Sequence, residues 1–395
     1  MGYKVRKQGG YTPDMSYVDV KPEMLLWARE RARLSGAELE GRFPKLGLWE
    51  RGEARPTLKQ LEALAKATYT PVGYLFLPEP PVEAIPIADF RTVRNVYLGH
   101  PTPNLLDTVY LCQQRQDWYR EFARLSGDQP RTFVRSVRRS DRIEAVADRM
   151  RQMLHFELDA RRDCPTWTEA LRQFIAQADA MGVLVMCSGV VFNNTHRKLD
   201  PDEFRGFAMA DDLAPLVFIN GADTKAAQMF TLAHELAHIW LGESGISDAD
   251  AATVPAHEIE RWCNQVAAEL LAPLRVVRDE LRFDSDIGSE VTRLARHFKV
   301  STLVVLRRVF DVGRLTRAEF NLAYASELER LRAVSRGSGG DFYLTQAARV
   351  SKRFARALVG STLEGQTLYR DAFRMLGISK LETFRAFSQS LETTH

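Results

Sequence analysis

Cysteine is scarce in this sequence. The 395 residues include four cysteines, Cys112, Cys164, Cys187 and Cys263, which stand far apart and form no C-x-x-C pair. This spacing argues against a disulfide framework and against a zinc site built from thiolates. Since scattered free thiols suit a reducing compartment, we expect a cytoplasmic protein.

Long hydrophobic runs are also missing. No apolar stretch approaches the roughly 20 residues that a membrane-spanning helix needs, so we expect no membrane partner. The first residues, MGYKVRKQGGYTPD, are basic but have neither an apolar core nor a small-residue cleavage site. They are therefore not a secretory signal, and residues 1–20 are expected to be a disordered leader.

A strong charge of one sign is the third feature that the chain lacks. Its net charge of +3 results from 54 basic and 51 acidic residues, so overall charge gives no argument for nucleic acid as a partner. Arginine is enriched locally, within residues 131–151. This enrichment indicates either solvated helix faces or contact with nucleic acid or an acidic protein.

Periodicity predicts a mainly helical chain with a small β component. A chain of this length with 45% hydrophobic residues can build two or three packed domains. Apolar residues recur with helical spacing through most of the sequence. Short β-type runs bounded by turn residues occur at 183–186 and 215–220. The predicted fold class is therefore mainly α with a small β-sheet, α+β.

The segment 231–241, TLAHELAHIWL, carries the strongest chemical signal. On a helix, His234 and His238 lie on one face about one turn apart, so both imidazoles can bind one zinc ion. Glu235 can reach a metal-bound water from the side. The remaining positions are mostly apolar, and unpartnered polar side chains would be costly to bury there. A zinc site is therefore favoured over structural histidines satisfied by hydrogen bonds.

A catalytic zinc needs a third protein ligand and an open position for water. The next predicted helix offers four candidates, which are His257, Glu258, Glu260 and Glu269. Glu260 is preferred because Asn264 follows four residues later on the same face and can hold a ligand histidine. His257 is more typical of a helix start, Glu258 would point elsewhere, and Glu269 lies among apolar residues like a buried structural carboxylate.

These residues predict metal-assisted hydrolysis. Zinc would lower the pKa of its water to about 7, and Glu235 would take the proton and pass it to the leaving amine. The run 215–220 is either an edge strand that pairs with an extended peptide or an ordinary core strand, and both alternatives stay open. His196, Arg205 and the tyrosines are the only guesses for an oxyanion donor.

The motif and its surroundings resemble the ImmA/IrrE family of metallopeptidases. The resemblance rests on FTLAHELAHIWLG at 230–242, PLVFIN at 215–220 and EIERWCNQVAAELLAP at 258–273, and it covers roughly residues 160–315. It implies an α+β, zincin-like peptidase core. Members of this family cleave repressor proteins, so the resemblance implies a regulatory endopeptidase acting on a specific protein.

Carried onto this chain, the resemblance assigns roles to four residues. It implies that His234, His238 and Glu260 bind Zn²⁺ and that Glu235 is the catalytic base. The assignment agrees with the ligand set that helical spacing favours.

The N-terminal part resembles the Cro/repressor-type (XRE) helix-turn-helix of many longer family members. The matching pieces are WERGE at 49–53, PT at 56–57 and LEALA at 61–65. Residues 40–48 leave too little room for the usual turn and recognition helix, and Pro44 cannot lie inside a helix. The module therefore either binds DNA weakly or docks a protein. The candidate DNA contacts are Arg42, Lys45, Arg51 and Arg55.

A second helix-turn-helix pattern lies at 291–313, with Ser301 capping its second helix. Its alternative is a structural helix pair that closes the peptidase domain. The tail, residues 316–395, resembles the C-terminal extension of long family members, which are often encoded beside a toxin. The alternative function is therefore an antitoxin-like regulator that binds DNA and a toxin, with peptidase activity secondary or absent. Expected partners are a repressor or toxin-like protein and, second, DNA; a homodimer is compatible with either function.

The predicted organisation follows from these segments. Its parts are a leader at 1–20, a helix-turn-helix module at 21–77, a Pro-rich linker at 78–103, a helical connection at 104–158, the metallopeptidase domain at 159–315 and a helical C-terminal domain at 316–395. In that last region Phe342, Tyr343, Phe354, Tyr369 and Phe373 are expected in a core, and Arg349, Lys352, Arg353 and Arg356 on a basic face.

Overall fold

The computed structural model describes residues 17–90, 101–247, 257–333 and 342–392. The chain divides into two compact units, the first formed by residues 1–84 and 99–106 and the second by residues 85–98 and 107–395. Most of the predicted leader lies outside the described residues. No helix among the described residues is long and apolar enough to cross a membrane.

The first unit is helical in its described part. Its elements are α1 (Pro22–Arg31), α2 (Gly36–Glu40), α3 (Leu46–Glu50), α4 (Leu58–Ala67) and the 3₁₀ helix η1 (Val72–Phe76). Thr57 and Gln60 form a capping box that begins α4. Leu25, Trp49 and Leu61 are buried in a small core shared by these helices.

Helix α3 spans five residues and follows Pro44 closely. It is thus too short to lie along the major groove as a full recognition helix does. The side chains expected to contact DNA are exposed, but two of them are engaged locally: Arg51 pairs with Glu53 at 2.8 Å, and Arg55 lies 3.8 Å from Asp19. DNA contact by Arg42, Lys45, Arg51 and Arg55 stays a prediction.

A mixed five-stranded sheet forms the centre of the second unit. The strands are β1 (Ala88–Asp89), β2 (Leu184–Ser188), β3 (Gly206–Met209), β4 (Leu216–Asn220) and β5 (Gly245–Ser247), in the order β1-β5-β3-β4-β2. β3 is antiparallel to β4 and β5, whereas the β2–β4 and β1–β5 pairs are parallel. Because β4 pairs on both sides, the edge-strand alternative for 215–220 is wrong: it is an internal strand.

Helices make up most of the remaining structure, so the predicted α+β fold class is confirmed. They are α5 (Pro103–Leu125), α6 (Ile143–Leu154), α7 (Leu158–Arg162), α8 (Trp167–Met181), α9 (Lys225–Leu241), α10 (Glu258–Leu271), α11 (Leu274–Glu280), α12 (Ile287–Phe298), α13 (Thr302–Asp311), α14 (Arg317–Ala333), α15 (Phe342–Val350), α16 (Lys352–Leu363), α17 (Tyr369–Leu376) and α18 (Leu381–Glu392).

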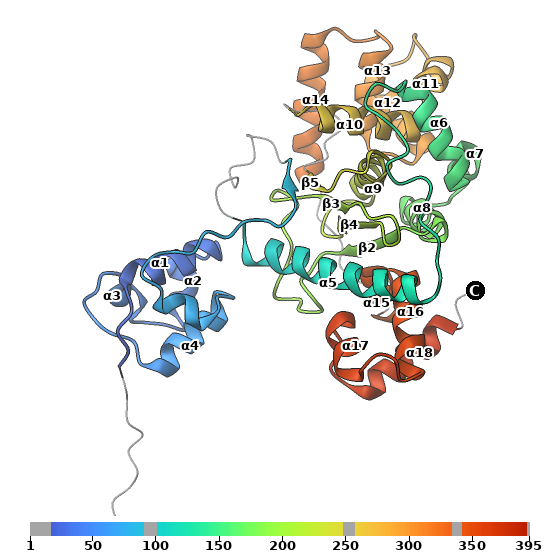
Figure 1. Cartoon of the computed structure of the whole chain (residues 1–395). Coiled ribbons are helices and arrows are strands. Elements are labelled where there is room, and N and C mark those ends of the chain that lie inside the picture. Colours follow the sequence, from blue (N-terminus) through green and yellow to red (C-terminus); the bar gives the residue numbers. More distant parts are fainter. Residues whose placement is uncertain (1–16, 91–100, 248–256, 334–341, 393–395) are drawn as a thin grey trace, which may run out of the picture. The chain divides into compact units, whose positions relative to one another are not determined.

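The sheet lies between two helical layers (Figure 1). Val185, Ala208 and Val217 point to one face and share a core with α8 and α9. Helix α5 runs along the other face, where the side-chain amide of Gln116 donates hydrogen bonds to the carbonyls of Met209 and Ala214 at 2.9 and 2.8 Å. This arrangement fixes α9 above β3 and β4.

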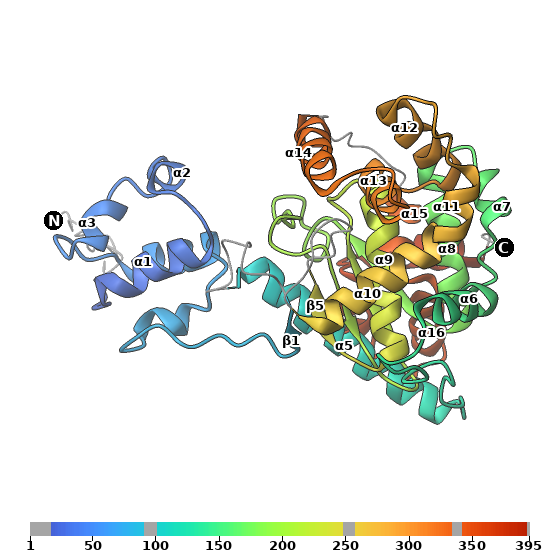
Figure 2. The ribbon, with the colours of Figure 1, turned by 90° about the horizontal axis from the view of Figure 1, so that it is seen from above.

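Helices α9 and α10 pack against each other, and α6 packs on α10 (Figure 2). The helical spacing of apolar residues over 257–281 predicts one helix, but Pro273 separates α10 from α11 because proline cannot donate the helical hydrogen bond. Helices α12 and α13 pack together and contribute Leu294 and Val305 to the same core as α9. Their burial favours the structural-pair alternative for 291–313.

Within the second unit, arginines join the C-terminal helices to the rest of the structure. Arg349 donates to Asn193 at 2.8 Å, and Arg353 donates to the carbonyl of Asp179 at 2.9 Å. These two side chains therefore do not form part of a free basic face. Phe354 is buried as predicted, but Tyr369 is 44% exposed, so its expected core position is wrong.

Candidate metal centre

Helix α9 carries the H-E-x-x-H motif through the interior. Thr224 caps its first turn by accepting a hydrogen bond from the backbone N–H of Ala227. The helix ends at Gly242, whose φ of 77° lies in the left-handed region. A Cβ at this position would also collide with Arg135, at 1.9 Å from its Cγ. Glycine is thus required where the motif helix stops.

Three side chains from α9 and α10 converge on one point. The Nε2 atoms of His234 and His238 lie 3.1 Å apart. The carboxylate of Glu260 places Oε2 at 3.2 Å from Nε2 of His234 and Oε1 at 2.9 Å from Nε2 of His238. All three residues are buried, with at most 2% of their surface exposed. Helical spacing of four and the packing of α10 on α9 produce this cluster.

Polar neighbours support the cluster. Nδ1 of His234 donates a hydrogen bond to Oδ1 of Asn264 at 2.9 Å. Ser247, on β5, places its hydroxyl 3.4 Å from Nε2 of His238 and 3.5 Å from Oε1 of Glu260. Asn264 thus occupies the supporting position that its spacing from Glu260 predicts, whereas Ser247 has no role in the sequence-based prediction.

Glu235 is fully buried, and neither of its carboxylate oxygens has a hydrogen-bond partner of good geometry. Burial, followed by the negative charge of Glu260, raises the pKa of Glu235 well above its ordinary value. Gly206 of β3 makes room for this carboxylate, because a Cβ there would lie 2.9 Å from Oε1 of Glu235 and 2.6 Å from Cγ2 of Thr231.

The other candidate ligands lie elsewhere. Glu258 is exposed and pairs with Arg139 at 2.7 Å. Glu269 is buried and pairs with Arg308 at 2.8 Å, consistent with a structural carboxylate. His257 occupies the N-cap position of α10 and is exposed.

Two of the guessed oxyanion donors, His196 and Arg205, lie in the segment between β2 and β3. His196 is exposed in the loop between β2 and β3. The guanidinium of Arg205 lies 3.8 Å from the carboxylate of Asp223.

Phe90 is a further neighbour that sequence reasoning missed. Its ring stacks on His238, with the ring centroids 5.7 Å apart and the planes 12° from parallel. Phe90, Gly206 and Ser247 reach the site from short strands or their ends. Their only sequence signals are runs of two to four residues, too short to show β periodicity.

The donor set fits a metal ion. Two facing Nε2 atoms 3.1 Å apart cannot both carry a proton between them, and a cation at their junction with Glu260 would satisfy all three groups. Burial tends to raise the pKa of Glu260, but the two histidines reverse the effect and lower it, so the carboxylate is ionised. Nε2 of His234 and Nε2 of His238 lie 3.2 and 2.9 Å from the oxygens of this carboxylate, close enough for one cation to contact all three groups. Two imidazoles and one carboxylate form a metal-binding set.

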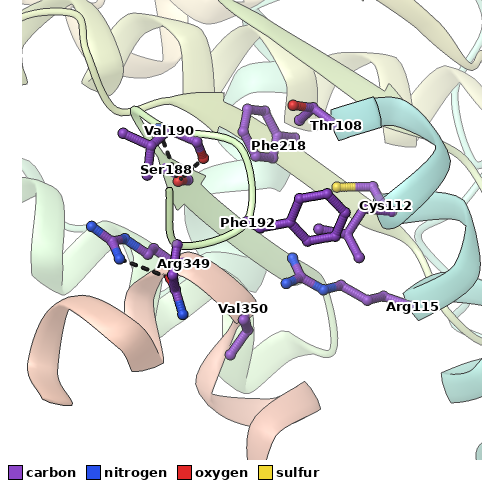
Figure 3. Close-up of a pocket in the computed structure, with 11 residues that line it drawn as sticks. Thr108, Cys112, Arg115, Ser188, Val190, Phe192, Phe218, Arg349 and Val350 are labelled. Atoms are coloured by element: carbon purple, nitrogen blue, oxygen red, sulfur yellow. Dashed lines mark hydrogen bonds between the residues drawn. The ribbon is translucent and has the colours of Figure 1, made fainter. Parts of the chain in front are cut away.

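A second concavity lies on the other face of the sheet, between α5, the end of β2 and α15 (Figure 3). Arg115 and Arg349 line it, together with Cys112 and Phe218. Arg115 directs Nε and Nη2 at the carbonyl of Met375, at 2.9 and 2.7 Å, and its burial lowers its pKa to about 10. These contacts serve to hold the C-terminal helices in place.

Two family models match parts of the chain. Residues 350–390 match the model of a domain of unknown function, DUF8813, which covers α16, α17 and most of α18. No curated protein matches the chain. Residues 178–310, which hold four of the five strands and both helices of the metal cluster, match the Peptidase_M78 family model, described as the IrrE N-terminal-like domain.

Proposed function

We propose that the chain is a regulatory zinc-dependent endopeptidase that hydrolyses a peptide bond in a specific partner protein. One observation carries the proposal: three buried donor atoms of His234, His238 and Glu260 converge on one point, and the carboxylate of Glu235, from the same helix as the histidines, is fully buried. A buried carboxylate without a cation to neutralise it is costly, which favours a functional role for Glu235. The match of residues 178–310 to a peptidase family model supports the same chemistry.

The residues of the site would have different roles in hydrolysis. His234, His238 and Glu260 would hold the zinc ion, and Asn264 would keep His234 in the tautomer that presents an unprotonated Nε2. When bound, zinc lowers the pKa of a water ligand to about 7 and polarises the scissile carbonyl. Glu235 accepts the proton of the attacking water at a carboxylate oxygen and donates it to the leaving amine.

A single, specific protein substrate fits this site better than general degradation. The cluster is buried, so an unselected peptide has no direct access to it. We propose a transcription repressor or a toxin-like protein as the substrate class, in keeping with the resemblance of the motif region. Cleavage of such a protein would change gene expression in one step.

The experiment compares the zinc-loaded wild type with Glu235→Gln during co-expression with the product of the neighbouring gene. We expect new N-termini in the partner, detected by mass spectrometry, and a loss of at least about 100-fold in cleavage rate in Glu235→Gln with zinc retained. Glu258→Gln, which changes an exposed carboxylate at the start of α10, is the matched control and should cleave normally. Partner neutralisation that persists in Glu235→Gln without cleavage would support the antitoxin-like alternative instead.

A further inference from the structure

The metal cluster is closed to solvent in this structure. His234, Glu235 and His238 have no exposed surface, and Glu260 is 2% exposed. A peptide bond must reach Glu235 and the metal for hydrolysis to occur. Some part of the cover must therefore move before a substrate can react.

One piece of that cover comes from the linker. Residues 88–90, here named the strap, follow the Pro-rich stretch of the chain. Ala88 and Asp89 form β1, a two-residue parallel strand on β5. The backbone N–H of Phe90 then donates a hydrogen bond to the carbonyl of Ile246 at 3.0 Å. The strap thus occupies the edge of the sheet next to β5 (Figure 2).

Phe90 brings the strap onto the metal ligands. Its ring stacks on His238 at a centroid distance of 5.7 Å and meets His257 edge-on, also at 5.7 Å. Gly245 lies beneath the ring, since a Cβ there would be 2.3 Å from Cε2 of Phe90. The ring of Phe90 therefore packs directly against the backbone of Gly245, and a larger residue at position 245 would displace the ring.

We propose that the strap is an autoinhibitory lid that occupies the β5 edge in place of substrate and closes the metal site with Phe90. An extended polypeptide commonly binds by adding a strand to an open sheet edge, and the β5 edge is open only when the strap leaves. This inference rests on the proposed peptidase function and adds its regulation.

The pairing that holds the strap on β5 is short. Its pairing with β5 is two residues long, and the side chains of Ala88 and Asp89 are exposed, so little apolar surface holds it beyond Phe90. The first compact unit consists of residues 1–84 and 99–106, so its two parts stand on either side of the strap in the sequence. A partner that binds the first unit can therefore act on the strap through chain connectivity, and a substrate can act by competing for the β5 edge.

The first test needs neither metal nor substrate. In the metal-free full-length chain, diethyl pyrocarbonate modifies accessible neutral imidazoles, and peptide mass spectrometry reports the rate at His238. We expect Phe90→Ala and Gly245→Ala each to raise that rate at least fivefold. Val82→Ala, which changes a 97% exposed linker residue, should leave it unchanged. Wild-type rates at His238 in both Phe90→Ala and Gly245→Ala, with circular dichroism unchanged, would overturn the lid.

The second test uses the zinc-loaded chain and separates the lid from the peptidase proposal. We expect Phe90→Ala to release zinc to a colorimetric chelator several-fold faster than wild type, and to cleave the partner protein faster. Phe90→Ala could show faster modification of His238 and faster zinc release while no variant cleaves the partner. That result would refute the peptidase function but would support the strap as a cover of the metal site. Cleavage by wild type at the same rate as Phe90→Ala, with unchanged zinc release, would refute the lid and keep the peptidase.

Discussion

The side-chain oxygen of Asn264 lies 2.9 Å from Nδ1 of His234 and accepts a hydrogen bond from it. An amide oxygen can only accept, so the proton of the neutral imidazole is fixed on Nδ1 and Nε2 is left free to face His238 and Glu260. One hydrogen bond between α9 and α10 thereby sets both the orientation and the tautomer of a proposed ligand.

Removal of that hydrogen bond should weaken metal binding without abolishing it. We expect Asn264→Ala to lower zinc affinity by about 10- to 100-fold, because the His234 ring loses its fixed orientation. Competition with a calibrated chelator measures the change. Gln265→Ala, at the exposed neighbouring position, is the control and should bind zinc like wild type. Equal affinities for the two variants would show that Asn264 does not support the site.

The two glutamates at the start of α10 should differ in metal content. Glu260→Gln removes the charged member of the cluster, and we expect elemental analysis to find far less than one zinc per chain. Glu258→Gln should keep one zinc per chain, because that carboxylate is exposed and pairs with Arg139. Full zinc occupancy in Glu260→Gln would contradict its role as the third ligand.

The buried pair of Glu269 and Arg308 should contribute to folding and not to metal binding. Arg308 donates to Glu269 at 2.8 Å and to the carbonyl of Ala272 at 3.0 Å. Since Arg308→Ala leaves a carboxylate buried without its cation, we expect a loss of about 3–5 kcal/mol in the free energy of unfolding by urea.

Zinc content should stay at one per folded chain in Arg308→Ala. Arg330→Ala breaks an exposed arginine–glutamate pair and should cost less than about 1 kcal/mol. A similar small loss in both variants would mean that the buried pair is not a structural element of the peptidase core.

Acid stability should depend on Asp211 in the turn between β3 and β4. Burial favours the neutral form of Asp211, but the backbone N–H of Ala214, the guanidinium of Arg120 and the N–H of Leu213 outweigh it and lower its pKa. The unfolded chain, with an ordinary aspartate pKa of about 3.9, therefore binds the proton more tightly. The stabilisation is complete above that value and is lost as pH falls through the lowered pKa of the folded state.

We expect Asp211→Asn to be less stable than wild type at neutral pH and to lose less stability between about pH 5 and pH 3. Urea unfolding at several pH values measures both effects. Asp117→Asn alters an exposed carboxylate that also bonds to Arg120 and should retain the wild-type acid dependence. Parallel stability curves for Asp211→Asn and wild type would contradict the assignment.

Local spacing made part of the site predictable. Two histidines four residues apart must share a face of a helix, and Glu260 and Asn264 repeat that spacing on the next helix. The sequence could not show how the two helices pack, because this depends on contacts over about 30 residues of chain. Helix type was also easier to predict than helix limits, as the interruption at Pro273 shows.

The sheet was harder to predict because its strands are short. β1 has two residues and β5 three, too few for an alternating pattern, so Ser247 and Phe90 gave no signal. Whether residues 215–220 form an edge or an internal strand depends on β3, which sequence reasoning did not identify. The neighbours of Glu235 thus became visible only through strand pairing.

Arginines join the C-terminal helices to the sheet, and these contacts affect how the second unit unfolds. Arg115 on α5 holds the carbonyl of Met375, and Arg353 holds Asp179 on α8. Loss of residues 342–392 would leave the buried guanidinium of Arg115 without its acceptor. The sheet and the C-terminal helices should therefore melt in one transition, and a shortened chain ending near residue 315 should be a poor source of folded peptidase domain.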